Sequence, residues 1–419
     1  MYTPEFLSIF SSNHFRMKLT LRFVLILGLF IHFTLASDAQ IWDPGKGCVI
    51  DANSNCVPNS LLSAVPFLTI IPDAIGGGMG DAGAATGADA YSLHYNASKL
   101  AFADRESSFG ASYTPWLRNL GLTDVYLAYL GGYKKINDEQ SFGAAFRFFS
   151  LGEINFTDVN GQPLGSGRPR EFELTAAYAR KLSPKFSAAL GAKFIYSNLA
   201  SGFQVGGVDI TSGKAFAADI SVTYHSNPDL QGIGTDFAFG ASISNLGSKI
   251  SYTNSSAREF IPANLRLGAA YKMNMDEYNS LTFVMDFNKL LLPTPYPADH
   301  PEYDENGDGV ADYRQKSTFG GVFGSFGDAP GGFSEELQEF SISVGAEYWY
   351  DQQFAVRAGY FYEHPLKGDR QYLTIGVGLK YNVIGIDIAY LAPTNSQRSP
   401  LDNTLRFSFT FNGFGDEAQ

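Results

Sequence analysis

Apolar and polar side chains alternate with a period of two along most of this chain, from about residue 105 to the C-terminus. In the stretch EFELTAAYARKL, Phe172, Leu174 and Tyr178 share one face, while Glu171 and Glu173 share the other. The stretches NLRLGAAYKM, EFSISVGAEYWY and TLRFSFTFNGF repeat the pattern, with aromatic residues near their ends. Such alternation predicts β-strands, and an apolar face opposite a polar face is typical of an outer-membrane barrel.

Fourteen such segments can be counted, and several have about 10–13 residues, the length of a tilted strand that crosses a bilayer. The connections are alternately short and long, and the longest runs from about residue 291 to 337. Short turns at one end and long loops at the other are expected of a barrel with an even number of strands. A β-sandwich also alternates, but the segment lengths and aromatic ends favour the barrel. The segments begin near residues 107, 122, 140, 171, 185, 214, 235, 264, 278, 338, 352, 371, 384 and 404.

The predicted fold is therefore all-β: a fourteen-stranded antiparallel transmembrane β-barrel over 105–414, preceded by a small helical and glycine-rich plug region over 40–104. Residues 40–104 do not alternate, and the stretch DAYSLHYNASKLAFA predicts one helical segment. An N-terminal region of this size can fold into the lumen of a barrel.

Residues 1–39 have the features of a secretory signal peptide. Lys18 and Arg22 form a basic region before an apolar run, and a site with small residues ends at Ala39. Residues before Met17 do not fit this pattern, which makes Met17 a candidate for the true start. A membrane anchor is the alternative, but the apolar run is short for a spanning helix, which needs roughly 20 residues.

Composition narrows the class of protein further. Charged residues are only 17% of the chain, whereas aromatic residues reach 15%. The net charge of −12 argues against a nucleic-acid partner, because binding phosphates needs a cationic surface. The six histidines form no spacing with Ser or acid that suggests a catalytic triad, and the sequence predicts no enzymatic activity.

The two cysteines, Cys48 and Cys56, lie close together just after the predicted cleavage site. In an oxidising compartment, such a pair predicts a local disulfide. A metal site is the alternative, but it would need more ligands than these two residues supply.

The stretch IGGGMGDAGAATGADA contains the pattern G-x-G-x-x-G, which is typical of dinucleotide-binding turns. That function requires parallel βαβ units, whereas the segments that follow predict antiparallel hairpins. Glycines also allow positive φ angles and a close approach of two backbones. We therefore interpret the glycines as the tightly packed entry of the plug; they are Gly76, Gly77, Gly78, Gly80 and Gly83.

The stretch DENGDGVAD, in the longest predicted loop, resembles a calcium-binding loop. Gly309 occupies the sixth position, but the twelfth position is Gln315 rather than the usual glutamate. A solvated turn is therefore the alternative to a structural Ca²⁺ site, and no other cofactor is expected. The candidate ligands are Asp304, Asn306, Asp308 and Asp312.

The stretches FLTIIPDAIGGGMGDAGAATGADAYSLHYNASKLAFA, SYTPWLRNL and YLAYLGGY closely resemble the PorV family of the type IX secretion system of Bacteroidetes. This family is itself similar to the fourteen-stranded FadL-like barrels. The resemblance extends from about residue 60 to the C-terminus, although Asn96-Ala97-Ser98 departs from the Asn-Pro-Ala frequent in FadL-like relatives.

The resemblance implies an outer-membrane protein that binds cargo with a type IX C-terminal signal domain at an SprA-type translocon. It would then pass this cargo to a PorU-type attachment complex at the cell surface. Besides these partners it would contact outer-membrane lipid, with both termini on the periplasmic side. The alternative on the same fold is a FadL-like transporter of hydrophobic small molecules.

Overall fold

The computed structural model describes residues 41–43, 48–50, 61, 63–118, 121–157, 160–205, 208–253, 258–296, 303–394 and 404–413. The predicted signal peptide lies outside these residues. Cys56 lies outside them as well, so the disulfide with Cys48 stays a prediction. Among the described residues, no helix is both long and apolar enough to cross a membrane.

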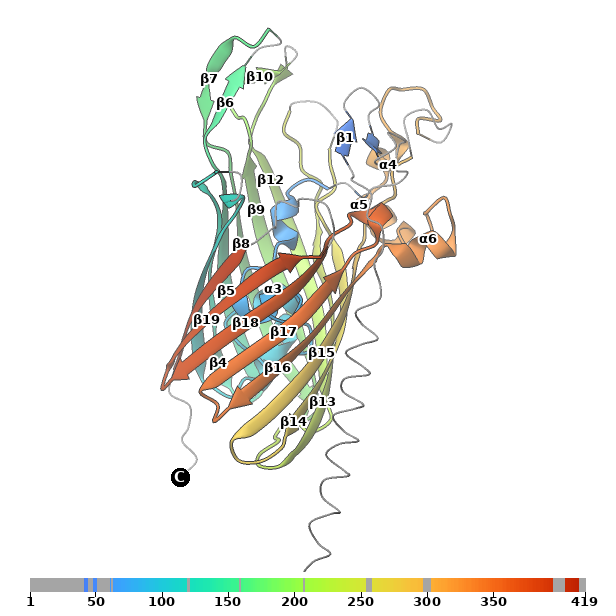
Figure 1. Cartoon of the computed structure of the whole chain (residues 1–419). Helices are drawn as coiled ribbons and strands as arrows, with labels where there is room; N and C mark the ends of the chain where they lie inside the picture. Colours follow the sequence, from blue (N-terminus) through green and yellow to red (C-terminus); the bar gives the residue numbers. More distant parts are fainter. Residues whose placement is uncertain are drawn as a thin grey trace, which may run out of the picture. The chain divides into compact units, whose positions relative to one another are not determined.

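Fourteen antiparallel strands form a closed barrel, as the alternation predicts (Figure 1). Each strand begins within three residues of its predicted start, and the largest difference is at β4, which was expected near residue 122. In chain order the strands are β3 (Ser107–Pro115), β4 (Val125–Asn137), β5 (Gln140–Leu151), β8 (Arg170–Ser183), β9 (Phe186–Asn198), β12 (Gly213–His225), β13 (Gly234–Gly247), β14 (Asn264–Asn274), β15 (Asn279–Leu290), β16 (Phe340–Tyr350), β17 (Phe354–Tyr362), β18 (Gln371–Tyr381), β19 (Ile384–Pro393) and β20 (Leu405–Asn412).

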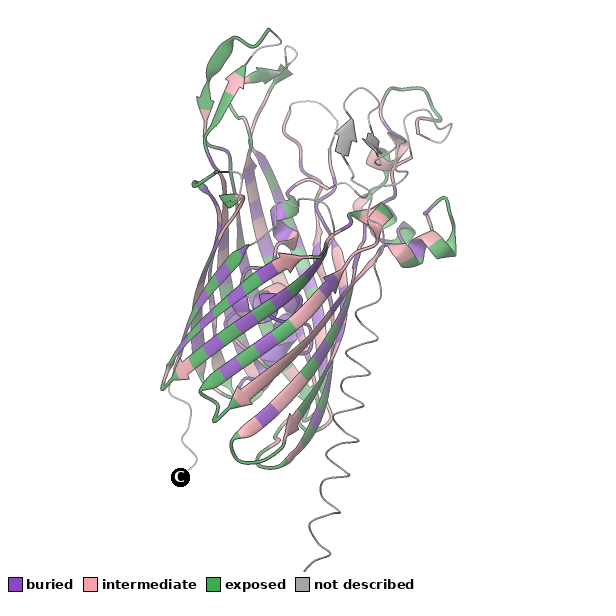
Figure 2. Ribbon diagram, in the orientation of Figure 1, coloured by how far each residue is buried: buried purple, intermediate pink, exposed green. Residues whose placement is uncertain are grey.

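Side chains alternate between the two faces of the wall, and Figure 2 shows buried and exposed positions in turn along the strands. On β18, Leu373, Ile375 and Val377 are exposed on the outer face, while Thr374 between them is buried. The exposed faces are thus apolar and the buried faces largely polar, which is the reverse of a water-soluble protein. This pattern gives the wall an outer surface suited to lipid.

The two ends of the barrel differ in their connections. At one end, here called the turn end, strands are joined by tight turns in which residues such as Asp351 and Asn382 have positive φ. The other end, here called the loop end, carries two hairpins, β6 (Ile154–Thr157) with β7 (Pro163–Gly167) and β10 (Gln204–Val205) with β11 (Val208–Asp209). It also carries three helices that the sequence pattern did not predict: α4 (Asp312–Gln315), α5 (Thr318–Gly324) and α6 (Phe333–Gln338). A separate pair of short strands near the N-terminus comprises β1 (Ile41–Asp43) and β2 (Cys48–Ile50).

The segment before β3 fills the lumen, where Figure 1 shows it enclosed by the strands. It contains η2 (Pro66–Thr69), α2 (Ala74–Gly77), α3 (Ser92–Tyr95) and η3 (Ala97–Phe102). The single helix expected over 89–103 is wrong, because Asn96 is extended, with φ −164°, and separates α3 from η3. The Asn96 side chain accepts a hydrogen bond from Ser98 N at 3.0 Å and donates to Ala84 O at 2.9 Å. These local bonds replace the helical ones and fix the break.

Candidate functional site

The glycine-rich segment of the plug lies directly against glycines of the wall. A Cβ added to Gly78 would come within 3.1 Å of Gly376 Cα on β18. Gly80 has φ +68°, and a Cβ there would come within 2.6 Å of Tyr360 O on β17. Gly359 on β17 faces the backbone of Gly80 in return. At Gly80 both the left-handed backbone and the lack of space require glycine.

The other glycines of this group contact long side chains instead. A Cβ on Gly77 would overlap Arg406 on β20, and one on Gly76 or Gly83 would overlap Tyr95 of α3. All five candidate glycines therefore lie at close contacts inside the lumen.

Wall side chains satisfy the backbone N–H groups of this segment. Gly83 N and Ala84 N both donate to one Asp286 oxygen, at 2.8 and 2.9 Å, and Gly80 N donates to Thr374 Oγ1 at 2.9 Å. A phosphate-binding turn would keep such groups available for its ligand. Here they hold the plug to β15 and β18.

Charged groups add a second layer to this contact. Asp81 accepts hydrogen bonds from Arg406 and from the hydroxyl of Tyr372, both at 2.5 Å. Arg266 on β14 lies 3.7 Å from Asp286. All four charged residues of this network are buried, namely Asp81, Arg266, Asp286 and Arg406. Because a buried charge is costly to separate from its partner, this network opposes movement of the plug.

Arg147 on β5 anchors the other end of the plug. Its guanidinium donates to the carbonyls of Phe67 and Leu68 at 3.2 and 2.9 Å, and it lies 3.3 Å from Glu173 on β8. It also lies 2.6 Å from His94 Nδ1. Burial and the neighbouring Arg147 hold the pKa of His94 well below its usual value, so the neutral imidazole accepts this hydrogen bond. His94 thus links α3 of the plug to Arg147 of the wall.

A small polar cavity of about 90 Å³ lies between plug and wall towards the loop end. A second cavity of about 200 Å³ lies between plug and wall towards the turn end. The smaller cavity has many polar and charged side chains around it, which suits water molecules. The residues around it include Asp81, His94, Lys193, Arg266, Arg370 and Tyr372.

The wall itself is closed. Every strand of the barrel is hydrogen-bonded to both neighbours, and the β3–β4 and β4–β5 pairs run over the full length of β3 and β4. Register shifts are confined to three places, one of them at Lys135 and Asn137 next to the turn end. The described strands thus leave no lateral gap.

The candidate calcium loop is a compact turn held by its own side chains. Asp304 accepts from Gly309 N at 2.8 Å, and Asp308 accepts from Val310 N at 2.9 Å. Gln315 donates to Asp308 at 2.9 Å, with a side-chain amide where a calcium loop would place a further carboxylate. Across the residues that the structure describes, no cluster of three or more His, Cys, Asp or Glu side chains could hold a metal ion. The calcium site stays a prediction.

The sequence indicated polar lining residues on the strands but missed their partners. The alternation shows which charged residues occupy inward-facing strand positions, among them Arg147, Asp286 and Arg406. Their contacts, however, depend on the position of the plug, which the alternation does not show. Arg357 on β17 shows the same limit, because it pairs with Glu347 on the adjacent β16 and with Asp387 on β19, two strands away, each at 2.6 Å.

Taken together, the fold and the filled lumen define an outer-membrane β-barrel that is closed by its own N-terminal segment. Within that class, the chain belongs to the PorV family, because the family model described as "Type IX secretion system protein PorV" matches residues 53–297, more than half of the chain. No match is found among curated proteins.

The solved structures to which the chain is similar include remote relatives. They include the TodX deltaS2S3 mutant monoaromatic hydrocarbon channel, with 12% identity over 81% of this chain and 98% of that one at a TM-score of 0.48. A toluene transporter TodX of P. putida matches with 12% identity over 82% and 99% at a TM-score of 0.46. A Pseudomonas aeruginosa FadL homologue matches with 12% identity over 85% and 100% at a TM-score of 0.40. At such values these likenesses carry no argument about ligands.

Proposed function

We propose that this protein is a cargo carrier of the type IX secretion system in the outer membrane. It binds exported proteins through their C-terminal signal domain at an SprA-type translocon and passes them to a PorU-type attachment complex on the cell surface. Membership of the PorV family supports its place in this system. The role requires no catalysis by the barrel.

The observation that carries the proposal is the plug, which occupies the lumen and is bound to the wall. A transporter of hydrophobic molecules needs a continuous apolar path or an opening in its wall. Here the plug is held by buried ion pairs such as Asp81–Arg406, and the strands around it are paired without a gap. The working surface is therefore the outside of the barrel and its loops, which argues against the FadL-like alternative.

The hairpins β6–β7 and β10–β11 are the surface that we assign to cargo. Phe156 and Phe203 join them, with ring centroids 4.2 Å apart. Leu164 and Val208 are exposed on them, at 53% and 47%. Paired strands with exposed apolar residues suit recognition of a folded β-rich or extended partner.

The loop end then faces the exterior and the end of β20 at Asn412 faces the periplasm, whereas the plug begins at the loop end, where Ala64 N donates to Phe260 O in the connection between β13 and β14. The expectation that both termini share the periplasmic side is therefore not kept for the N-terminal segment.

A deletion strain tests this function. Surface-attached proteins with the signal domain should fall to background, and a plasmid copy of the wild-type gene should restore them. A copy in which a short Gly-Ser turn replaces residues 154–167 should fold but fail to restore attachment. The exposed turn-end variant Lys185→Ser serves as the matched control and should restore it. Normal surface attachment together with lost uptake of a hydrophobic nutrient would show that the transporter alternative is right.

A further inference from the structure

The loop-end part of β15 contains a lysine in an unusual place. Phe283, Met285 and Phe287 point outward from β15 and are 44%, 43% and 39% exposed. Lys289 continues this row, because its cross-strand partners Leu265 and Phe340 belong to the same outer face. Yet Lys289 is only 1% exposed. Something on the outside of the barrel covers it.

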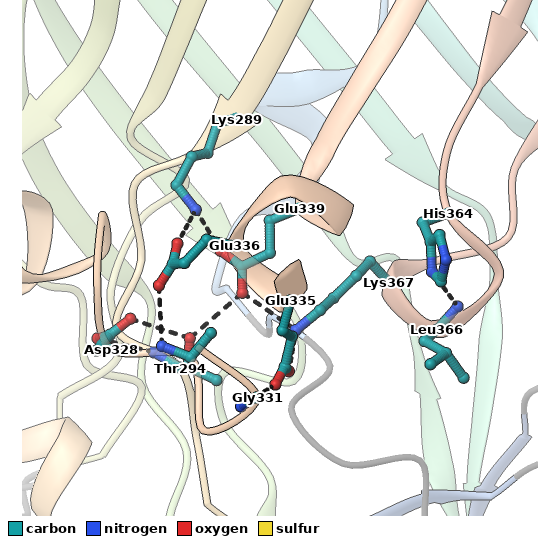
Figure 3. Close-up of polar contacts among 11 residues, drawn as sticks. Lys289, Thr294, Asp328, Gly331, Glu335, Glu336, Glu339, His364, Leu366 and Lys367 are labelled. Atoms are coloured by element: carbon teal, nitrogen blue, oxygen red, sulfur yellow. Dashed lines mark hydrogen bonds and ion pairs between the residues drawn. The ribbon is translucent and has the colours of Figure 1, made fainter. Parts of the chain in front are cut away.

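That cover is α6, whose acidic side faces the wall (Figure 3). Lys289 Nζ lies 2.9 Å from Glu336 and also contacts Glu339. Lys367, from the turn between β17 and β18, reaches the same helix and lies 2.7 Å from Glu335 and 3.1 Å from Glu339. Two lysines from different parts of the rim thus hold one short helix by its three glutamates.

Helix α5 covers the neighbouring part of the same outer face. Its Val322 is buried in a cluster with Ala263 and Leu291, against Leu265 and Ile243. Leu265 and Ile243 are cross-strand partners on β14 and β13. They share the outward face with Phe237 and Tyr271, which are exposed closer to the turn end. Both helices therefore lie outside the barrel, along its loop end from β13 to β17.

The sides of α5 and α6 that face away from the wall are apolar. Phe319 and Phe323 are 67% and 71% exposed and stack with ring centroids 6.5 Å apart. Phe333 is 78% exposed and Leu337 55%, and between the helices Phe326 is 49% exposed. On α6 the charges face the wall, and on both helices large apolar groups face outward, which is the reverse of a helix on a water-facing surface. Figure 2 shows these helices as a largely exposed part of the loop end.

We propose that the α5–α6 segment is a lipid-facing collar, which lies in the boundary between headgroups and acyl chains of the outer membrane at the loop end. The five apolar residues Phe319, Phe323, Phe326, Phe333 and Leu337 form its lipid-contacting surface. The collar continues the outward apolar rows of β13–β15, so the same lipid that covers Phe287 reaches it. Helices with one strongly apolar face bind membranes in this manner. The ion pairs with Lys289 and Lys367 fix its orientation and remove the cost of an unpaired lysine next to lipid.

Site-directed spin labelling of the full-length barrel tests the collar. In a Cys48→Ser, Cys56→Ser background, single labels are placed at Phe333→Cys and Phe323→Cys and reconstituted into vesicles of dioleoylphosphatidylcholine. Ile375→Cys, on the outer face of β18, is the control for lipid, and Glu305→Cys, in an exposed loop, is the control for water. Folding of each variant is checked by its heat-modifiable migration on gels.

The measured quantity is the ratio of a label's accessibility to oxygen over its accessibility to a water-soluble nickel chelate. At 323 and 333 this ratio should be at least half the ratio at 375. The label at 305 should show the opposite preference. Water-like accessibility at both collar positions in vesicles would overturn the proposal. So would labels that become shielded from both reagents only in native outer membranes, because that result would assign the surface to a protein partner. These outcomes do not depend on cargo transfer and leave the proposed function to its own test.

Discussion

Two buried cations hold two regions of the loop end in opposite ways. Arg147 points into the lumen from β5 and is buried by the plug, whereas Lys289 points outward from β15 and is buried by α6. Near Arg147 the connections continue as free hairpins, and near Lys289 the connection folds back onto the wall. One barrel end thus combines a side that projects with a side that lies flat against the membrane-facing surface.

This difference indicates that a loop is fixed to the barrel where its ion pairs are buried, and that an exposed ion pair does not fix it. The pair Lys289–Glu339 has side chains 1% and 0% exposed, while Arg168–Glu153 in the hairpin region is 81% and 44% exposed. Exposed pairs contribute little to stability, whereas breaking a buried pair leaves an uncompensated charge. The two hairpins contact each other through the rings of Phe156 and Phe203.

The largest expected effect is from Arg147→Met. It removes the hydrogen bonds to the plug carbonyls and leaves Glu173 buried without its cation, which should cost about 3–5 kcal/mol of the free energy of unfolding. Urea unfolding of the purified barrel, followed by heat-modifiable migration, measures this loss.

The same substitution on the next strand supplies the control for Arg147. Arg180→Met removes an exposed arginine near the turn end, 3.9 Å from Glu139, and should leave stability nearly unchanged. Adding Glu173→Gln to Arg147→Met should recover part of the loss. Equal stability of the two single variants would contradict the inner anchor.

Lys289→Met should have the next largest effect, confined to the collar. Glu339 keeps Lys367, whereas Glu336 loses its cation and retains the hydrogen bond from Ala329 N, so the loss should be about 1–3 kcal/mol. Hydrogen exchange of 333–338 should become faster, while exchange of the plug stays the same. Lys316→Met is the matched control. Lys316 also pairs with a carboxylate, that of Asp328 at 3.4 Å, but its side chain is 42% exposed. Unchanged exchange in α6 would show that the clamp is not needed.

Phe156→Ala tests the projecting side. Loss of the ring contact with Phe203 should weaken the association of the two hairpins by about 0.5–1.5 kcal/mol. Tryptic cleavage after Arg168 should become faster, and cleavage within the collar should not change. Leu164→Ala, at an exposed position of the same hairpin, should leave the rate near that of the wild type.

The barrel and the order of its strands could be predicted from the sequence because alternation is a local signal. It placed β3, β5, β14, β18 and β19 at their observed first residues. The helices α5 and α6 could not be predicted in this way, since α6 is held by Lys289 of β15 and Lys367 of the β17–β18 connection, and α5 by the apolar contacts of Val322. A six-residue helix such as α6 has little stability of its own and depends on such contacts.

The candidate site, like the fold, could be predicted from the sequence only in part. The sequence directed attention to the glycines of the plug, because a run of glycines marks close backbone approach wherever it occurs. It could not show that Gly80 meets Gly359 or that Gly83 meets Asp286, which lies 203 residues away along the chain. Such pairs follow from the register of the closed wall and the position of the plug within it.

The smallest expected effect is from Arg168→Ala. Its guanidinium lies 3.0 Å from Glu153, but both side chains are largely in solvent, so the change should alter the free energy of unfolding by no more than about 0.5 kcal/mol. The variant should fold and assemble like the wild type. Any change in the surface attachment of cargo then reports on the lost positive charge of the hairpin alone. A loss of stability as large as that of Lys289→Met would show that exposed pairs also fix this loop end, and the contrast between its two sides would fail.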